Sequence, residues 1–295
     1  IKDFGNIING DSSKDTYIAL TSILEELLSQ NIICIVLGGS QDLSLPIFHA
    51  IKNTQKKTNI SIIDSRIDIG KEDQDFNSFS FISHLLKDEK LGRLQHIAHQ
   101  SYYTPTSHLE LLDKYNHSYK RLGLLRKNIE SVEVFMRDSD FASLDMAAVK
   151  QSDSPAHYFS SPNGLNSEEI CKLGLLAGYS DRLKVFGMFE LNPNFDKNGQ
   201  TSSLAAQVIW HFLEGVNNRQ DDYPKRNLKE YKQYFVEHHL IDESIVFYQN
   251  EFNNRWWIEV PNKNNKKEVF SCNFEEYKDA KSGKIPEIWF KYYKK

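Results

Sequence analysis

The sequence lacks the features that would place it among secreted, membrane-spanning or nucleic-acid-binding proteins. It has only three cysteines, Cys34, Cys171 and Cys272, which form no CxxC pair, so neither a zinc knuckle nor a disulfide framework is expected. No apolar run reaches the roughly 18 residues that a bilayer span needs, and the printed residues, which begin at Ile1 rather than Met, predict no signal peptide among themselves. The net charge of −4 supplies no basic field for nucleic acid. These absences predict a cytoplasmic protein with no membrane span and no nucleic-acid partner.

Short apolar runs that end in polar residues predict the strands of a parallel sheet. Residues 32–37 form a continuous apolar run that stops at two glycines, and residues 60–63 form a second run that stops at Asp64. Such runs are typical of strands buried on both faces. Residues 43–52 have helical periodicity, so the segment predicts a βαβ unit.

The same patterns continue along the chain to about residue 216. Apolar runs predict further strands, and periodicity predicts further helices. The predicted strands are 94–98, 132–136, 141–144 and 185–191, and the predicted helices are 17–28, 109–126, 164–177 and 201–216. Residues 70–80 are polar and predict a loop, whereas residues 81–86 are compatible with either a helix or a strand.

The chain changes character at about residue 220, where it becomes polar and aromatic. We therefore divide it into an α/β domain at residues 1–220 and a C-terminal extension at residues 221–295 that packs on it. Two interpretations of the extension's tryptophans stay open. They pack against the main domain, or they form a partner-binding surface, since Trp and Arg are enriched at interface hot spots.

Four short motifs lie at the ends of predicted strands. Because the carboxyl ends of parallel strands meet at one edge of a sheet, where open α/β proteins bind their ligands, we expect these motifs to form one site. They are Gly38-Gly39-Ser40-Gln41, Asp64-Ser65-Arg66-Ile67-Asp68, Ser143-Leu144-Asp145-Met146-Ala147 and Phe189-Glu190-Leu191-Asn192-Pro193.

In this order, the motifs resemble those of the arginase/agmatinase/formimidoylglutamase (ureohydrolase) family. The family motifs are Gly-Gly-x-His, Asp-Ala-His-x-Asp and Ser-x-Asp-x-Asp, and the resemblance covers about residues 31–216. It implies a three-layer α/β/α fold with a mainly parallel sheet. Family members carry their first strand before the segment that corresponds to Ile1, and we expect that strand to be missing here. The resemblance also implies a trimer, a hexamer or another homo-oligomer.

The resemblance implies a degenerate metal site. In the family, two Mn²⁺ ions share four aspartates and two histidines and activate a water molecule. The aspartate positions that this chain retains are Asp64, Asp68 and Asp145, and the replaced ligand positions are Gln41, Arg66 and Ala147. An amide is a poor Mn²⁺ ligand beside imidazole, and a guanidinium cannot coordinate a metal. No cofactor is therefore expected, and the six positions are interpreted as vestigial.

Arg66 suggests what compensates the remaining carboxylates. Three carboxylates at adjacent strand ends repel one another without a cation, and an arginine can donate to carboxylates in a planar fork. We hypothesise that the Arg66 guanidinium pairs with Asp64 and Asp68 in place of the metal cluster. In the alternative, Arg66 points to solvent and the aspartates cap unrelated loops.

Two functions follow from these residues. The first is a metal-free pseudoenzyme that acts as a binding or scaffold protein for a protein partner or within a homo-oligomer. The alternative is an active formimidoylglutamase- or agmatinase-like hydrolase of linear amidine or guanidine C–N bonds, with manganese as its cofactor. In that alternative, the resemblance assigns substrate binding to Glu190 and proton shuttling to His84. No catalytic residue is otherwise assigned.

Overall fold

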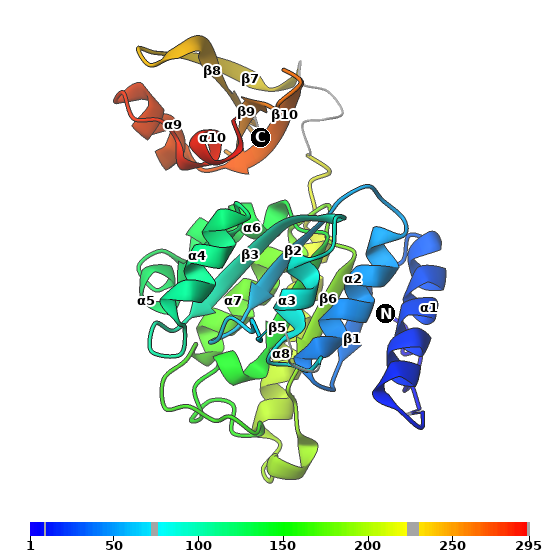
Figure 1. The fold of residues 1–295 in the computed structure, drawn as a ribbon. Helices are drawn as coiled ribbons and strands as arrows, with labels where there is room; N and C mark the ends of the chain where they lie inside the picture. The colour runs from blue at the N-terminus through cyan, green and yellow to red at the C-terminus, as the bar shows by residue number, and fades with distance from the viewer. Residues whose placement is uncertain (9, 72–75, 223–229, 294–295) are drawn as a thin grey trace.

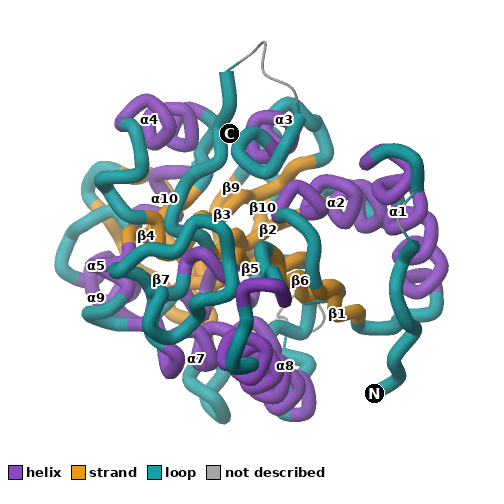
Figure 2. The backbone as a smooth tube through the Cα atoms, turned by 90° about the horizontal axis from the view of Figure 1, so that it is seen from below, coloured by secondary structure: helices purple, strands orange, loops and turns teal. Residues whose placement is uncertain are grey.

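A six-stranded parallel sheet forms the centre of the first part of the chain in this computed structural model, which describes residues 1–8, 10–71, 76–222 and 230–293. The strand order is β1-β6-β5-β2-β3-β4, and each neighbouring pair is parallel. The strands are β1 (Cys34–Leu37), β2 (Thr58–Ile63), β3 (Leu91–His99), β4 (Ser118–Arg121), β5 (Phe141–Asp145) and β6 (Val185–Phe189). Helices cover both faces (Figures 1 and 2), so the expected three-layer α/β/α architecture is confirmed.

Each face of the sheet has its own hydrophobic core, because both faces of the central strands are apolar. One core contains the buried side chains of α1 (Ser13–Ser29), α2 (Ser44–Lys52), α3 (Phe81–Leu86) and α4 (Thr106–Lys114). The other contains those of α5 (Leu122–Leu125), α6 (Glu133–Arg137), α7 (Ser167–Gly178) and α8 (Gln200–Asn217). Short 3-10 turns connect these elements at Gln41–Leu43, Ile129–Val132, Met146–Ala148 and Pro193–Phe195.

Hydrogen bonds within the first turn of α7, the helix that precedes β6, fix where this helix begins. The Asn166 side chain accepts a hydrogen bond from the Glu169 backbone N–H at 2.8 Å, and the Glu169 carboxylate accepts one from the Asn166 backbone at 2.8 Å. This reciprocal capping satisfies donors that the first turn of a helix leaves open. Near its other end, α7 packs against α8 at Gly178, where a Cβ atom would collide with the carbonyl oxygen of Phe212. The glycine therefore permits a close approach of the two helices.

Two predicted elements are wrong. The periodic segment 109–126 contains α4, the edge strand β4 and α5 rather than one helix. The segment 132–136, predicted as a strand, lies in a 3-10 turn and α6. Glu133 and Arg137 form an ion pair at 2.6 Å with the i,i+4 spacing of a helix, and such pairs stabilise helices. Residues 81–86, left open between two states, are helical.

The C-terminal part forms a second sheet with its own hydrophobic core. Four antiparallel strands have the order β10-β9-β8-β7, and two short helices pack against them. The elements are β7 (Lys232–His238), β8 (Ile241–Gln249), β9 (Trp256–Pro261), β10 (Lys267–Cys272), α9 (Phe274–Lys281) and α10 (Glu287–Tyr292). We call residues 230–293 the C-terminal unit. Its tryptophans Trp256, Trp257 and Trp289 are at most 6% exposed and lie in apolar clusters of the C-terminal unit itself, rather than in a core shared with the main domain. Trp257 also contacts the Arg137 guanidinium, which lies 4.8 Å from its ring centre. The predicted division between residues 220 and 221 precedes this sheet and stays a prediction.

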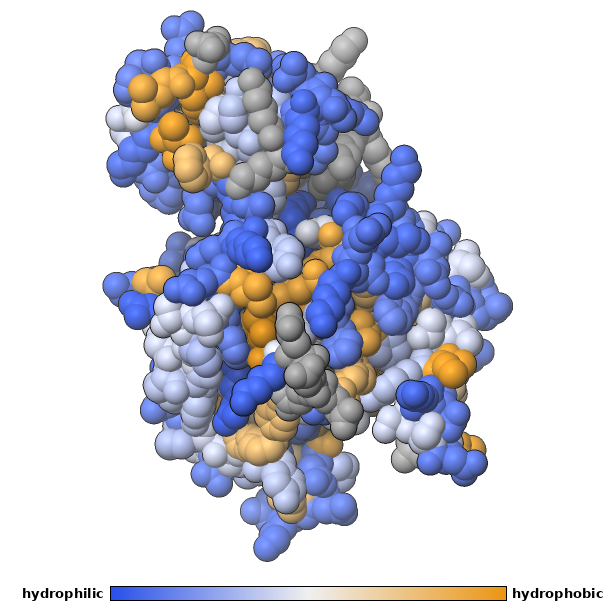
Figure 3. Space-filling model, viewed as in Figure 1, coloured by the Kyte–Doolittle hydropathy of each residue, from blue (hydrophilic) through white to orange (hydrophobic). Residues whose placement is uncertain are grey.

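Asp138 anchors the C-terminal unit to the central sheet. Its carboxylate is buried and accepts hydrogen bonds from Arg93 Nη1 at 2.7 Å, Ser271 Oγ at 2.6 Å and the Ser271 backbone N–H at 3.1 Å. Arg137 donates to the Trp256 carbonyl oxygen at 3.0 Å. The two parts meet across a constriction in the space-filling view (Figure 3).

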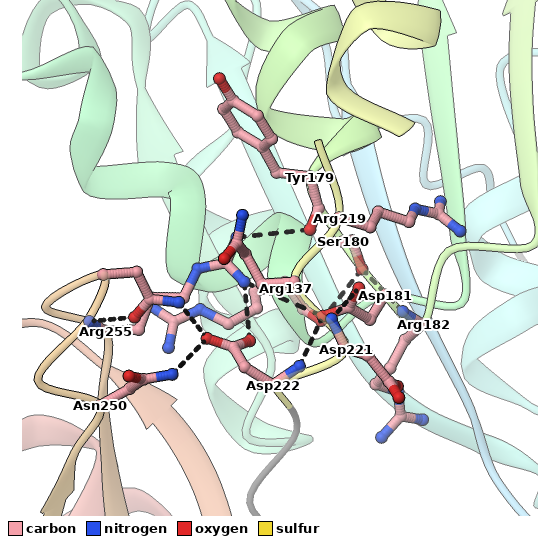
Figure 4. A network of polar contacts seen from close by, with 12 residues as sticks. Arg137, Tyr179, Ser180, Asp181, Arg182, Arg219, Asp221, Asp222, Asn250 and Arg255 are labelled. Atoms are coloured by element: carbon pink, nitrogen blue, oxygen red, sulfur yellow. Dashed lines mark hydrogen bonds and ion pairs between the residues drawn. The ribbon is translucent and has the colours of Figure 1, made fainter. Parts of the chain in front are cut away.

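A second group of ion pairs joins the two parts through Arg255. Its guanidinium contacts Asp222 at 2.8 Å and donates to the Tyr179 carbonyl oxygen at 3.3 Å (Figure 4). It also contacts the Glu133 carboxylate at 3.3 Å. Because Arg255 is 12% exposed at its side chain, these contacts are screened less than surface pairs. These polar contacts therefore hold the C-terminal unit against the first part of the chain.

The C-terminal unit docks at the amino-terminal ends of the central strands. Arg93 lies near the start of β3, and Asp138 lies just before β5. The predicted site lies at the opposite, carboxyl-terminal edge of the sheet. One strand length separates it from the docked unit, which is about 17–30 Å at a rise of 3.3 Å per residue. None of the helices in the described ranges is long and apolar enough to cross a membrane.

Candidate functional site

The four motifs meet at one edge of the sheet, as the sequence predicts. They follow β1, β6, β5 and β2, which are consecutive neighbours in the sheet. A cavity of about 20 Å³ opens at this edge, which is room for about one water molecule. Five of its lining residues are Asp64, Arg66, Asp68, Asp145 and Glu190. Ala147, Ser65 and Ser78 also line it, together with Phe79 and Phe159.

Glu190 is fixed in a conformation that few non-glycine residues adopt. Its φ is 60°, and its backbone N–H donates to the Gly39 carbonyl oxygen at 2.9 Å. Its carboxylate Oε1 accepts a hydrogen bond from the Gln41 backbone N–H at 3.0 Å. Gly39 itself has a φ of 73°, which glycine adopts without a steric penalty. The two turns together hold the Glu190 carboxylate at the cavity, and such strained residues are concentrated at functional sites.

The three aspartates are buried and electrostatically coupled. Burial raises the pKa of Asp64, and burial together with the Asp64 charge raises the pKa of Asp68 well above its usual range. Burial, with the charges of Asp64 and Glu190, has the same effect on Asp145. The Asp64 Oδ2 atom is buried without a hydrogen-bond partner among the described residues. The site therefore favours protons or a positively charged group at these oxygens.

Arg66 does not form the predicted fork with the aspartates. Its guanidinium carbon lies 4.5 Å from the centre of the Tyr103 ring and 5.6 Å from that of Phe159. No ion pair joins it to Asp64 or Asp68 in the part of the chain that the structure describes, and only its backbone N–H bonds Asp64, at 3.1 Å. Cation–π attraction between guanidinium and ring faces explains this position. The direct pairing hypothesis is thus wrong, although the Arg66 charge still lowers the pKa of Asp68 and Asp145.

Gln41 and Ala147, which stand at two of the replaced ligand positions, each donate a hydrogen bond to a neighbouring residue of the site. Gln41 is 1% exposed and donates from Nε2 to Ser143 Oγ at 3.1 Å. Its Oε1 atom has no partner among the described residues. Ala147 has no donor on its side chain, and its backbone N–H donates to Asp145 Oδ1 at 2.6 Å.

The histidines do not supply a base to this cavity. His84 does not line it and instead packs against Phe76, with ring centres 4.9 Å apart. His96 and His99 are buried on β3, and burial lowers their pKa to about 3 and about 4. Both rings are therefore neutral at physiological pH. The shuttle role for His84 gains no geometric support.

The aromatic side of the cavity could not be predicted from the sequence. Phe79 and Phe159 contact each other edge to face, with ring centres 5.1 Å apart, and are 39% and 41% exposed. Tyr103 completes the surface that holds Arg66. All three lie in irregular segments, where neither periodicity nor a motif marks them.

A model of the arginase family matches residues 1–214 of this chain. The chain belongs to the arginase family. It is 26% identical to the formimidoylglutamase of Clostridium tetani over an alignment that covers 72% of this chain and 69% of that protein. It is 23% identical to the formimidoylglutamase of Bacillus subtilis, with coverage of 62% and 60%. The family assignment and the predicted resemblance are thus confirmed.

Solved structures of arginase-family proteins share the fold. The manganese-bound formiminoglutamase of Trypanosoma cruzi has a TM-score of 0.68 at 22% identity, covering 72% of this chain and 75% of that one. The agmatine ureohydrolase of Thermoplasma volcanium has a TM-score of 0.62 at 22% identity, covering 73% of both chains. At this level of identity, the likeness establishes the fold alone.

The side chains of this arginase-family site do not fit a two-manganese cluster. Two positions hold an amide and an alanine, and the third holds a guanidinium stacked on aromatic rings. Across the described ranges, no three His, Cys, Asp or Glu side chains form a group that could hold a metal ion. Manganese prefers imidazole and carboxylate ligands in a defined geometry. The site therefore lacks the ligand set with which a metal pair would activate a water molecule.

Proposed function

We propose that this arginase-family chain is a binding or scaffold protein rather than a manganese-dependent hydrolase. One observation carries the proposal: a permanent cation, Arg66, is held on the Tyr103 and Phe159 rings where the family motif places a metal-binding histidine. A fixed positive charge at this place repels a dication and cannot coordinate it. The fold is retained, while the groups that would activate water are not.

The cavity favours a ligand or partner group with positive charge. Its carboxylates, Asp64, Asp68, Asp145 and Glu190, outnumber its single guanidinium. Burial, followed by the charges of Asp42 and Asp64, raises the pKa of Glu190, so a cation would relieve repulsion there. This positively charged group would belong to a small molecule, a protein partner or a second copy of the chain.

The test combines turnover and binding. We expect no release of urea or formamide from arginine, agmatine or formimidoylglutamate, with or without added Mn²⁺. We expect methylammonium, a small monocation, to bind without Mn²⁺ in calorimetry, and Glu190→Gln to weaken that binding at least fivefold, because charge-assisted hydrogen bonds are the stronger ones. Manganese-dependent turnover would refute the proposal. Absence of methylammonium binding would refute the cationic ligand while leaving the lack of turnover in place.

A second candidate is a formimidoylglutamase-like hydrolase. It is favoured by the names of the relatives in Clostridium tetani and Bacillus subtilis and by the retained carboxylates at the strand ends. This function requires another ligand set or a non-metal route, since a hydrolase needs an activated water and a base. Turnover of formimidoylglutamate that Glu190→Gln abolishes would favour it.

A further inference from the structure

A cleft of about 750 Å³ lies between the arginase-like part and the C-terminal unit. One wall comes from α6 and the carboxyl ends of α7 and α8. The other comes from the turn between β8 and β9 and the segment that joins β10 to α9. This position is remote from the motif site, because the C-terminal unit docks at the opposite edge of the sheet. Small molecules often bind in clefts of this size at domain interfaces.

The charges of the cleft already compensate one another. Arg137 donates to the Glu133 carboxylate in a fork, through Nε at 3.0 Å and Nη2 at 2.6 Å. Arg255 shares Glu133 and also bonds Asp222 (Figure 4). Glu130, the remaining carboxylate of the lining, pairs with Lys172 at 2.7 Å. A charged ligand would have to displace one of these pairs, so the lining favours an uncharged ligand.

The C-terminal unit presents aromatic rings to this cleft. Trp256 is buried in its wall, Phe274 is 48% exposed, and Phe252 at the tip of the β8–β9 turn is 99% exposed. Phe274 lies against Trp256 with ring centres 5.3 Å apart. An apolar ring as exposed as Phe252 gains nothing from folding, but it would gain contact area from a flat ligand.

Amide groups around the rings have unused hydrogen-bonding capacity. Asn218 and Gln220 use their side-chain nitrogens in hydrogen bonds, so their oxygens remain available. Asn254 and Asn273 use their oxygens, so their Nδ2 donors remain available. These four atoms make no hydrogen bond in the described parts of the chain, and all four residues line the cleft. The cleft therefore offers both donors and acceptors beside ring faces.

We propose that the cleft binds an uncharged polar ring, which stacks on Phe252 and Phe274 and bonds the four amides through its edge. Neutral saccharides and nucleosides share this chemistry: each has a ring face together with hydroxyl or amide groups at its rim. The site does not depend on the function proposed for the motif cavity. It uses the C-terminal unit, for which the arginase-family match at residues 1–214 gives no role.

Calorimetric titration of the full chain tests the proposal. The uncharged probes are maltotriose and N-acetylglucosamine in one arm, and adenosine and uridine in the other. Their charged counterparts are glucosamine and adenosine 5′-monophosphate. We expect one arm to bind at one site per chain with a Kd of about 1 mM or tighter, and the charged counterpart to bind at least fivefold more weakly. The arm that binds identifies the source of the ring, and binding in both arms also supports the proposal.

Variants on the cleft decide whether the binding occurs there. Phe252→Ala should weaken binding about twofold to tenfold through lost stacking. Asn254→Asp keeps the oxygen that bonds Gln249 but removes the Nδ2 donor, and it should weaken binding to a similar extent. Phe235→Ala is the matched control, because Phe235 on β7 is 66% exposed and lies outside the cleft. The proposal is overturned if neither arm binds below about 10 mM, or if Phe252→Ala and Phe235→Ala behave alike.

Discussion

Asp138→Asn should loosen the C-terminal unit from the central sheet. The Asp138 carboxylate accepts two hydrogen bonds from Ser271 and one from Arg93, and it is 1% exposed. Burial alone would raise its pKa, but the Arg93 charge and the Ser271 hydrogen bond hold the pKa below its usual value. An asparagine keeps the shape but turns an NH₂ group towards these donors. Breaking a buried charge pair costs about 3–5 kcal/mol, and we expect about 3 kcal/mol because the Arg93 side chain retains 14% exposure.

Urea unfolding followed by two probes measures this effect. Three of the four tryptophans, Trp256, Trp257 and Trp289, lie in the C-terminal unit, so fluorescence reports mainly on that unit. Far-UV circular dichroism reports mainly on the helices around the parallel sheet. We expect Asp138→Asn to lower the fluorescence midpoint more than the dichroism midpoint. Glu251→Gln, which breaks an exposed ion pair with Lys232, is the control. Equal effects of the two variants, or a loss below about 1 kcal/mol, would refute the anchoring role.

Three further variants test local features of the fold. His96 is fully buried with both ring nitrogens unpartnered among the described residues, and burial lowers its pKa to about 3. As the pH falls below about 6.5, the unfolded chain binds a proton at this histidine and the folded chain does not, so the protein loses stability. Between pH 7.5 and 5.5 this loss amounts to about 1.4 kcal/mol, and His96→Leu should abolish it. An unchanged pH dependence of the free energy of unfolding would contradict this. Ala98 has a φ of 75°, so Ala98→Gly should raise the free energy of unfolding by about 1 kcal/mol, and a loss would argue against strain there. Gly178→Ala should cost about 1–3 kcal/mol in urea unfolding through the collision with Phe212, and a neutral effect would show that α7 and α8 can separate.

Strand-end motifs were predictable because parallel strands deliver their carboxyl ends to one edge. The run before Asp64 is buried along its whole length, as its apolar pattern predicts. The run before Gly38 forms a strand as expected, but β1 is an edge strand with Leu37 55% exposed, so its predicted burial on both faces is wrong. The helix predicted over residues 164–177 was also found, as α7 at Ser167–Gly178, because its apolar periodicity extends over several turns. Segment 132–136 was misread because its apolar residues pack from a short helix, and a run of this length does not distinguish strand from helix.

The position of Arg66 could not be predicted from the motif. Sequence proximity to Asp64 and Asp68 suggested a pair, but the competing Tyr103 and Phe159 rings come from loops far along the chain. A long side chain reaches several partners, and tertiary contacts decide among them. The second sheet was not predicted, because its antiparallel strands bury aromatic residues that are equally expected in an extension packed on the α/β domain.

Metal content measured on matched proteins tests the central claim most directly. The parent chain and the variant Gln41→His/Arg66→His/Ala147→Asp would be purified alike, dialysed against Mn²⁺ and analysed for bound metal. We expect no stoichiometric manganese in the parent and up to about two ions per chain in the variant, the number that a binuclear hydrolase site holds. About two manganese ions in the parent would contradict the loss of the metal site.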